Sequence, residues 1–367
     1  MGYIYFDNAA TTKPLDNFLD NKLYSNPSSV HEFGINAMEA IVSVKKYLAE
    51  KIGCSHEEIY FTSGATESNN IAVLGSNNKS IITTKNQHPS VAGPIKALHQ
   101  KKSTVKYLDV LGGFLNIREL EYAIDQDTTL ISLTHVNNES GITEDIKKLG
   151  FLIKKNNPRA LFHVDGAQSF GKFEINLKAC NIDLFTFSAH KIHGNKGFGG
   201  LVINKGVNIK PLFYGGQQQN GIRPGTEDAM AALAFKKACS AAFDNIQKNY
   251  QHAATLRDTM AALLSEIPDC VINTDLENSS PYILNASFLG IKGEILLNAL
   301  SEKGVYVATG AACSGRQVSN NLIAHNFPEG HAESAIRFSF SRYNTVQEVE
   351  LCVSILKGEV KKLRGES

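Results

Sequence analysis

Short runs of β-branched and aromatic residues alternate along the chain with stretches in which apolar residues recur every three or four positions. Several runs are apolar without alternation, which is typical of strands covered on both faces. The runs cover residues 58–62, 80–84, 104–108, 129–133, 160–164, 183–187 and 200–203. Two of the helical stripes are Ala37, Ala40, Ile41, Val44 and Leu48, and Ile146, Leu149, Leu152 and Ile153. This alternation predicts an α/β fold with a mainly parallel, doubly wound sheet, in which ligands bind beyond the carboxyl ends of the strands.

After about residue 228 the pattern changes. An Ala-rich helical region spans 228–265, strand-like runs follow at 282–288 and 335–340, and helical stripes lie near 294–303 and 349–363. Strands and helices mixed in this way predict a smaller α+β domain. We therefore expect a large domain formed by residues 13–245, and a small domain formed by residues 1–12 and 246–367.

Composition and charge exclude several classes of protein. The chain has 367 residues, and 37 basic against 36 acidic residues give a net charge of +1, so nucleic-acid and membrane-surface binding are not expected. No apolar run approaches the length of a membrane span, and the N-terminus has no signal-peptide pattern. The six cysteines are far apart, without a CxxC pair or a disulfide framework. These features predict a cytoplasmic protein.

Polar groups stand where several predicted strands end. The first run leads into a helix through the small residues of 62–69, where free main-chain N–H groups and the Ser63 and Thr66 hydroxyls suit a phosphate. The same segment also fits an ordinary capping box. Neither a GxGxxG nor a P-loop pattern occurs, so a dinucleotide or nucleoside triphosphate is not indicated.

Three titratable residues follow other strands, and each has a structural alternative. Asp165 fits either a helix cap or a partner for a protonated ring nitrogen. Lys191 fits either a lysine that extends to water or a Schiff-base amine. His88 fits a structural histidine or an acid–base group. His190 and His193 have no third ligand nearby, so no metal is expected. Taken together, a phosphate cradle, a carboxylate, a lysine and a histidine at strand ends are what pyridoxal 5'-phosphate requires.

The motifs at these positions resemble those of fold-type I pyridoxal-phosphate enzymes of the class V aminotransferase group, and specifically the cysteine desulfurases. The matching segments are 6–12, 26–31, 61–70, 135–139, 163–168, 188–191, 223–226, 310–314 and 334–339. They extend over most of the chain. The resemblance implies a large domain built on the doubly wound sheet and a small domain that carries a catalytic cysteine loop.

The resemblance also implies residue roles. Lys191 would hold the cofactor covalently and move protons at the substrate Cα, Asp165 would pair with the pyridine nitrogen, and His88 would stack on the ring and take part in acid–base steps. The remaining implied cofactor contacts are Ala65, Thr66, Ser188 and His190 at the phosphate, Asn138 and Gln168 at the ring hydroxyl, and Thr226 at the phosphate of a neighbouring subunit. The last contact implies a homodimer. Asn8, Ala9 and Arg337 would bind the substrate carboxylate.

Cys313 decides which reaction the resemblance implies. It lies in the small, glycine-flanked segment 309–315, which favours a reactive thiol over a buried inert one. The implied reaction converts L-cysteine to L-alanine, with sulfur transferred to Cys313 as a persulfide. Sulfur then passes to an acceptor for iron–sulfur cluster, thio-cofactor or tRNA biosynthesis. The chain ends at Ser367, soon after the last predicted helix, which leaves the acceptor open.

Three alternatives remain from the sequence. A transaminase or a selenocysteine lyase of the same fold would make Cys313 incidental. A non-catalytic partner or scaffold protein could retain the fold and its cofactor site without the reaction.

Overall fold

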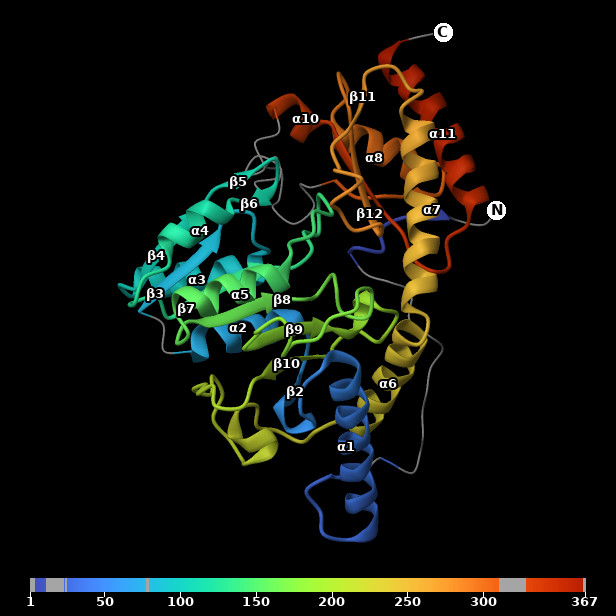
Figure 1. The fold of residues 1–367 in the computed structure, drawn as a ribbon. Coiled ribbons are helices and arrows are strands. Elements are labelled where there is room, and N and C mark those ends of the chain that lie inside the picture. The colour runs from blue at the N-terminus through green and yellow to red at the C-terminus, as the bar shows by residue number, and fades with distance from the viewer. Residues whose placement is uncertain (1–3, 11–22, 24, 77–78, 310–327, 366–367) are drawn as a thin grey trace.

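The computed structural model describes residues 4–10, 23, 25–76, 79–309 and 328–365 and confirms the predicted α/β fold (Figure 1). Its helices are α1 (Glu32–Ile52), α2 (Ala65–Gly75), α3 (Pro89–Gln100), α4 (Ile117–Ala123), α5 (Ile146–Asn156), α6 (Ala229–Phe243), α7 (Ile246–Leu264), α8 (Gly293–Glu302), α10 (Glu329–Glu333) and α11 (Val346–Arg364). Its strands are β1 (Ile4–Tyr5), β2 (Ile59–Thr62), β3 (Ser80–Thr84), β4 (Thr104–Leu108), β5 (Val110–Leu111), β6 (Phe114–Leu115), β7 (Leu130–Thr134), β8 (Leu161–Asp165), β9 (Leu184–Ser188), β10 (Gly199–Ile203), β11 (Cys270–Ile272), β12 (Ile283–Phe288), β13 (Val305–Tyr306) and β14 (Ala335–Ser339).

The described part of the chain contains a seven-stranded sheet with the order β2-β10-β9-β8-β7-β3-β4. Neighbouring strands from β9 to β4 are parallel, and β10 is antiparallel to both β2 and β9. The predicted strand runs all match strands of this sheet to within one residue at each end. Thr134, Asp165 and Thr186 are register partners across β7, β8 and β9, so the carboxyl ends of these strands meet at one edge.

Both faces of this sheet are buried, as the unbroken apolar runs predict. One set of strand residues packs with α1, α5 and α6, and the other packs with α2 and α3. Ile81 and Ile82 of β3 illustrate the alternation, because these adjacent residues belong to opposite clusters and both are fully buried. The rings of Phe170, Phe187 and Phe235 stack in the first cluster, with centroids 4.6 to 5.9 Å apart.

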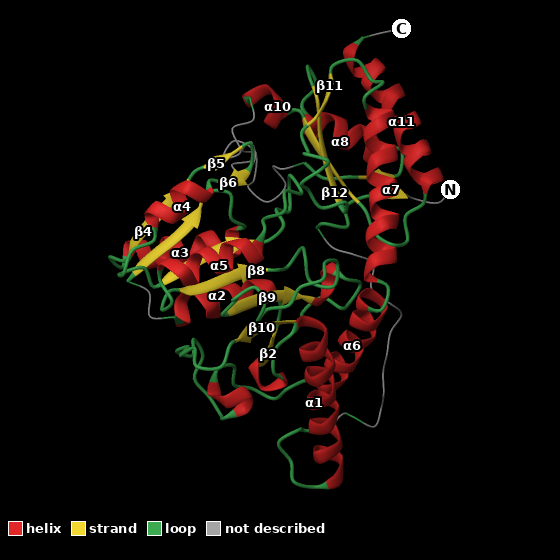
Figure 2. Cartoon of the chain, in the orientation of Figure 1, coloured by secondary structure: helices red, strands yellow, loops and turns green. Residues whose placement is uncertain are grey.

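A separate apolar cluster lies around a three-stranded antiparallel sheet, β11-β12-β14, which packs with α7, α8 and α11 (Figure 2). The N-terminal strand β1 pairs in parallel with β13, and Phe6 belongs to this second cluster. The domain boundaries themselves stay a prediction. None of the described helices has both the length and the apolar character needed to cross a membrane.

The helical region predicted over 228–265 consists of two helices. α6 ends at Phe243 and α7 begins at Ile246. Between them, the Asp244 carboxylate accepts a hydrogen bond from the Ser240 hydroxyl and pairs with Lys51 of α1 at 3.0 Å. These contacts of Asp244 accompany the end of the first helix, at a position where the apolar pattern gives no sign of a break.

Candidate active site

The carboxyl ends of the strands and the N-terminal segment enclose a cavity of about 600 Å³. This volume lies in the range of small-molecule sites. The sequence-predicted residues that line the cavity are Ala9 near the N-terminus, Arg337 of β14, and Ala65, Thr66, His88, Asn138, Asp165, Gln168, Ser188, His190 and Lys191 of the part between them. The structure therefore brings together most of the residues that the sequence singles out, and their individual roles remain predictions.

One end of the cavity has the character of an anion site. Helix α2 begins at Ala65, directly after Gly64, and the first N–H groups of a helix have no acceptor within it. The Ser188 hydroxyl is buried, has no hydrogen-bond partner among the described residues, and belongs to the same lining. Burial, together with the nearby lysines 191, 196 and 172, lowers the pKa of His190 to about 4. His190 is thus neutral at pH 7 and can donate a hydrogen bond or accept one.

Asp165 ends β8 and places a carboxylate in the wall of the cavity. The residue is 5% exposed. Its Oδ2 accepts a hydrogen bond from the Asn69 side-chain amide at 2.9 Å, and its Oδ1 accepts one from the main-chain N–H of Ala167 at 3.0 Å. These two hydrogen bonds fix the orientation of the carboxylate in the cavity wall.

His88 caps the N-terminus of α3. Its Nδ1 accepts from the main-chain N–H of Ser90 at 3.2 Å and lies 2.7 Å from the Ser90 hydroxyl. Burial lowers the pKa of His88, an effect that Asp165 opposes and Lys191 reinforces. Since Nδ1 acts as an acceptor, the neutral imidazole carries its proton on Nε2.

Lys191 ends a short 3-10 turn (Ala189–Lys191) that follows β9. Its Nζ donates to the main-chain carbonyls of Ala9 and Ala10, at 2.5 and 2.8 Å. The same Ala9 carbonyl accepts from the Gln168 side chain at 2.9 Å. The N-terminal segment therefore holds the amine at the cavity wall. The sequence indicates this segment as a matching motif, but it does not indicate the contact with Lys191.

Arg337 of β14 connects the second sheet to the cavity. The residue is 7% exposed, its Nη2 pairs with Asp7 at 2.6 Å, and its Nη1 donates to the Asn138 carbonyl at 2.8 Å. Its Nε is buried and has no partner within the part of the chain that the structure describes. A guanidinium in this position presents positive charge to the cavity, and a substrate carboxylate would compete with Asp7 for it.

Three predicted residues lie elsewhere or outside the described chain. The Asn8 side chain donates to Tyr5, Ser339 and Asn344, so it supports the N-terminal segment and does not line the cavity. Thr226 lines a neighbouring hollow of about 560 Å³, which shares Ser63 and Glu67 with the cavity. Cys313 lies outside the described residues.

Several residues that support the site have no assigned role in the sequence analysis. Asn69 and Ser90 connect Asp165 to His88, and Asp7 pairs with Arg337. Lys172 is a buried lysine next to Gln168. Asp7 and Asn69 lie within the motif segments 6–12 and 61–70, which was the available signal, but the partner of each residue cannot be predicted from local sequence.

The residues present fit pyridoxal phosphate. The helix start and the unpartnered Ser188 hydroxyl suit its phosphate, Asp165 suits a protonated pyridine nitrogen, and Lys191 suits its aldehyde. Among the described residues no group of three metal-ligating side chains is found.

Comparison with known proteins gives a consistent result over the whole chain. The family model Aminotransferase class-V matches residues 4–352. A protein named cysteine desulfurase from Trichormus azollae is 35% identical over 382 residues, which cover 100% of this chain and 95% of that protein. A solved NifS-like protein is 34% identical with a TM-score of 0.91, covering 98% of this chain and all of that one. A structure described as SspA in complex with cysteine is 28% identical with a TM-score of 0.81, covering 93% of this chain and 100% of its own.

Proposed function

Because the chain belongs to the class V aminotransferase family and matches cysteine desulfurases along its length, we propose that it is a pyridoxal-phosphate-dependent cysteine desulfurase. It takes sulfur from L-cysteine as a persulfide on Cys313 and releases L-alanine. One observation supports this function above the others: Lys191, Asp165 and the start of α2 share one cavity with the buried Arg337 guanidinium. That set can receive both a phosphorylated cofactor and an amino-acid carboxylate.

Four residues of the cavity have separate roles in the proposed reaction. When bound, pyridoxal phosphate supplies a conjugated ring that accepts the electron pair left on the substrate Cα. Lys191 would hold the cofactor and move the proton at Cα, and Asp165 would pair with the ring nitrogen. Arg337 would orient the substrate carboxylate. His88 would donate a proton from Nε2 or accept one there.

Sulfur transfer is assigned to the thiolate of Cys313. It attacks the substrate sulfur, so that the S–S bond of a persulfide forms and the Cβ–S bond breaks. The electron pair of the broken bond stays on the carbon side, and protonation there gives alanine. The other five cysteines suit this role poorly, because burial raises the pKa of each of them.

The oligomeric state, acceptor and location are part of the proposal. A homodimer would allow Thr226 of the partner subunit to reach the phosphate, and the hollow that holds Thr226 adjoins the cofactor cavity through Ser63 and Glu67. The acceptor would serve iron–sulfur cluster, thio-cofactor or tRNA biosynthesis, and the protein would act in the cytoplasm.

The test is product analysis combined with mass spectrometry. The purified protein with pyridoxal phosphate, L-cysteine and a reductant is expected to release alanine and sulfide in equal amounts. Without reductant, one added sulfur is expected on Cys313, and borohydride reduction is expected to fix the cofactor on Lys191. Amino transfer to an oxo acid without sulfide, or full sulfide release by a Cys313→Ala variant, would contradict the proposal.

A further inference from the structure

Lys172 is a buried lysine beside the candidate active site. It is 7% exposed, and its Nζ lies over the Tyr282 ring at 5.2 Å from the centroid. Among the described residues, no carboxylate lies within ion-pair distance of it. Burying an ammonium group without a carboxylate is costly, so its polar contacts indicate why it is there.

The polar contact of Lys172 is with Gln168, one of the predicted cofactor residues. Lys172 Nζ donates to Gln168 Oε1 at 3.4 Å, and Gln168 Nε2 donates to the Ala9 carbonyl at 2.9 Å. An ammonium group has three donors and no acceptor. While Lys172 is charged, it therefore holds the carbonyl oxygen of the Gln168 amide toward itself and the NH₂ group toward Ala9 and the main cavity.

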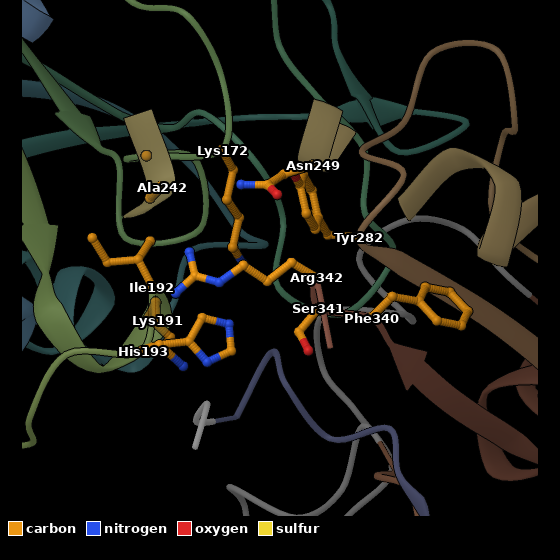
Figure 3. Close-up of a pocket in the computed structure, with 11 residues that line it drawn as sticks. Lys172, Lys191, Ile192, His193, Ala242, Asn249, Tyr282, Phe340, Ser341 and Arg342 are labelled. Atoms are coloured by element: carbon orange, nitrogen blue, oxygen red, sulfur yellow. The ribbon is translucent and has the colours of Figure 1, made fainter. Parts of the chain in front are cut away.

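The other surroundings of Lys172 offer no competing carboxylate. Figure 3 shows Lys172 together with Lys191, His193 and Arg342 around a small cavity of about 30 Å³. In this view the Arg342 side chain extends across the cavity between Lys172 and His193. The described lining contains no acidic residue. The positive charges around this small cavity repel the Lys172 ammonium group, whereas the amide oxygen of Gln168 attracts it.

We propose that Lys172 is a positioning residue, which orients the Gln168 amide so that its NH₂ group serves as a donor to an oxygen atom of the cofactor ring. This rests on the proposed function, because it assigns a donor to the cofactor that function requires. Lys172 itself need not touch cofactor or substrate. Its effect passes through one amide whose two ends have opposite hydrogen-bonding character.

The control that Lys172 exerts should depend on pH. Burial, and then the cations of Lys191 and Arg337, lower the pKa of Lys172 to about 7. A neutral amine carries a lone pair and can accept a hydrogen bond, so above this pH it no longer fixes the amide. The other titratable groups that face it from neighbouring segments are His190, His193, Tyr282 and Arg342.

The test compares Lys172→Met, Lys172→Arg and Lys45→Met in the full chain. Lys45 is the comparison lysine, since it also lies over an aromatic ring, Phe61 at 5.3 Å, and donates to a glutamine, Gln219 at 3.5 Å, outside the cavity lining. Unlike Lys172, it also pairs with a carboxylate, Glu227 at 3.8 Å. The readout is the dissociation constant for pyridoxal phosphate from pH 6 to pH 8.5, followed by the absorbance of the bound cofactor.

We expect Lys172→Met to weaken binding about tenfold at pH 6, a typical effect of losing a hydrogen bond to a charged group. Lys45→Met should bind like the original protein. As pH rises through about 7, the affinity of the original protein for pyridoxal phosphate should fall more than that of Lys172→Arg, because the guanidinium stays charged. In a Gln168→Leu background, the Lys172→Met effect should disappear, because the two residues act through one amide.

Equal affinity of Lys172→Met and the original protein at pH 6 would overturn the role of Lys172, and so would full additivity with Gln168→Leu. If Lys172→Met does not fold, the pH dependence of pyridoxal phosphate binding is compared between Lys172→Arg and the original protein. An identical pH dependence of the two proteins would contradict the proposal. Failure of the original protein to bind pyridoxal phosphate at all would instead refute the proposed function.

Discussion

The side-chain amide of Asn69 donates to Asp165 Oδ2 at 2.9 Å, and both residues are buried. The same nitrogen lies 2.9 Å from the Ser90 hydroxyl, which in turn lies 2.7 Å from His88 Nδ1. One amide group on α2 thus links the carboxylate that ends β8 to the histidine that caps α3. The two hydrogens of the Asn69 amide match two acceptors, Asp165 Oδ2 and the Ser90 hydroxyl oxygen, so losing either bond leaves a buried group unpaired.

Replacing Asn69 by Ala should therefore disturb the site without removing any predicted contact to substrate or cofactor. The Asp165 carboxylate loses a hydrogen bond, which for a charged group is worth about 1.5–3 kcal/mol. We expect kcat/KM for L-cysteine to fall by about tenfold to a hundredfold, with a shift in the pH dependence of the cofactor absorbance.

A suitable control for that change is Asn156→Ala, because the Asn156 amide donates to the Leu152 carbonyl within α5, away from the cavity lining. This variant should keep the kinetic constants of the original protein. If both variants behave alike, the link from Asn69 to Asp165 has no functional role.

Arg337 is the predicted site for the substrate carboxylate, and its geometry makes a prediction about KM. Arg337→Lys keeps the charge and loses the forked pair of donors, which now reach Asp7 and the Asn138 carbonyl. We expect KM for L-cysteine to rise about tenfold or more, with a smaller change in kcat. The comparison variant is Arg257→Lys, another buried arginine, which contacts Asp258 and the Ser279 carbonyl away from the cavity. An unchanged KM for Arg337→Lys would remove the substrate role of Arg337.

The main sheet and the positions of the site residues were predictable because both depend on local patterns. An apolar run bounded by polar residues predicts a buried strand, and the residues at or just beyond its carboxyl end lie at one edge of the sheet. Asp165 is the last residue of β8, and Lys191 follows β9 by three residues. The supporting contacts were not predictable. Asn69 meets Asp165 across 96 positions and Asp7 meets Arg337 across 330, and no local spacing encodes such pairs.

The same limit applies to the Asn8 side chain. Its motif suggests a substrate contact, whereas its amide is used within the N-terminal segment and by Ser339. An asparagine next to a reactive segment looks the same in sequence whether it meets a ligand or holds the main chain in place. The pairing of β1 with β13 and the bridge from Asp7 to Ser339 of β14 place the Asn8 amide among main-chain carbonyls, and a substrate contact of Asn8 stays a prediction.

The cysteines give a prediction that separates Cys313 from the others. Burial raises the pKa of Cys54 and Cys352 to about 12 and that of Cys270 to about 11, and it also raises the pKa of Cys180 and Cys239. Because the thiolate is the reactive form, iodoacetamide at pH 7.5 should alkylate Cys313 well before these five. Peptide mass spectrometry of the folded protein measures this order. In urea all six should react, and rapid labelling of Cys352 in the folded protein would contradict the expectation.

The buried Glu144 carboxyl group should make the free energy of unfolding depend on pH. Burial raises its pKa from 4.5 to about 7. The hydrogen bond that it accepts from the main-chain N–H of Leu115 acts in the opposite direction and lowers the pKa. Since the folded state binds this proton more tightly than the unfolded chain, Glu144 lowers the free energy of unfolding as pH rises from about 4.5 through about 7. The loss amounts to about 3 kcal/mol at most.

Glu144→Gln should remove this loss, because the amide is uncharged at every pH and can still accept from Leu115. Urea unfolding should give similar stability for the two proteins at pH 4, and the variant should be the more stable of the two at pH 8. Glu119→Gln is the control, because its carboxylate also accepts a main-chain N–H, from Asp109, but at an exposed position. A stability difference between Glu144→Gln and the original protein that stays constant from pH 4 to pH 8 would show that the Glu144 proton is not linked to folding.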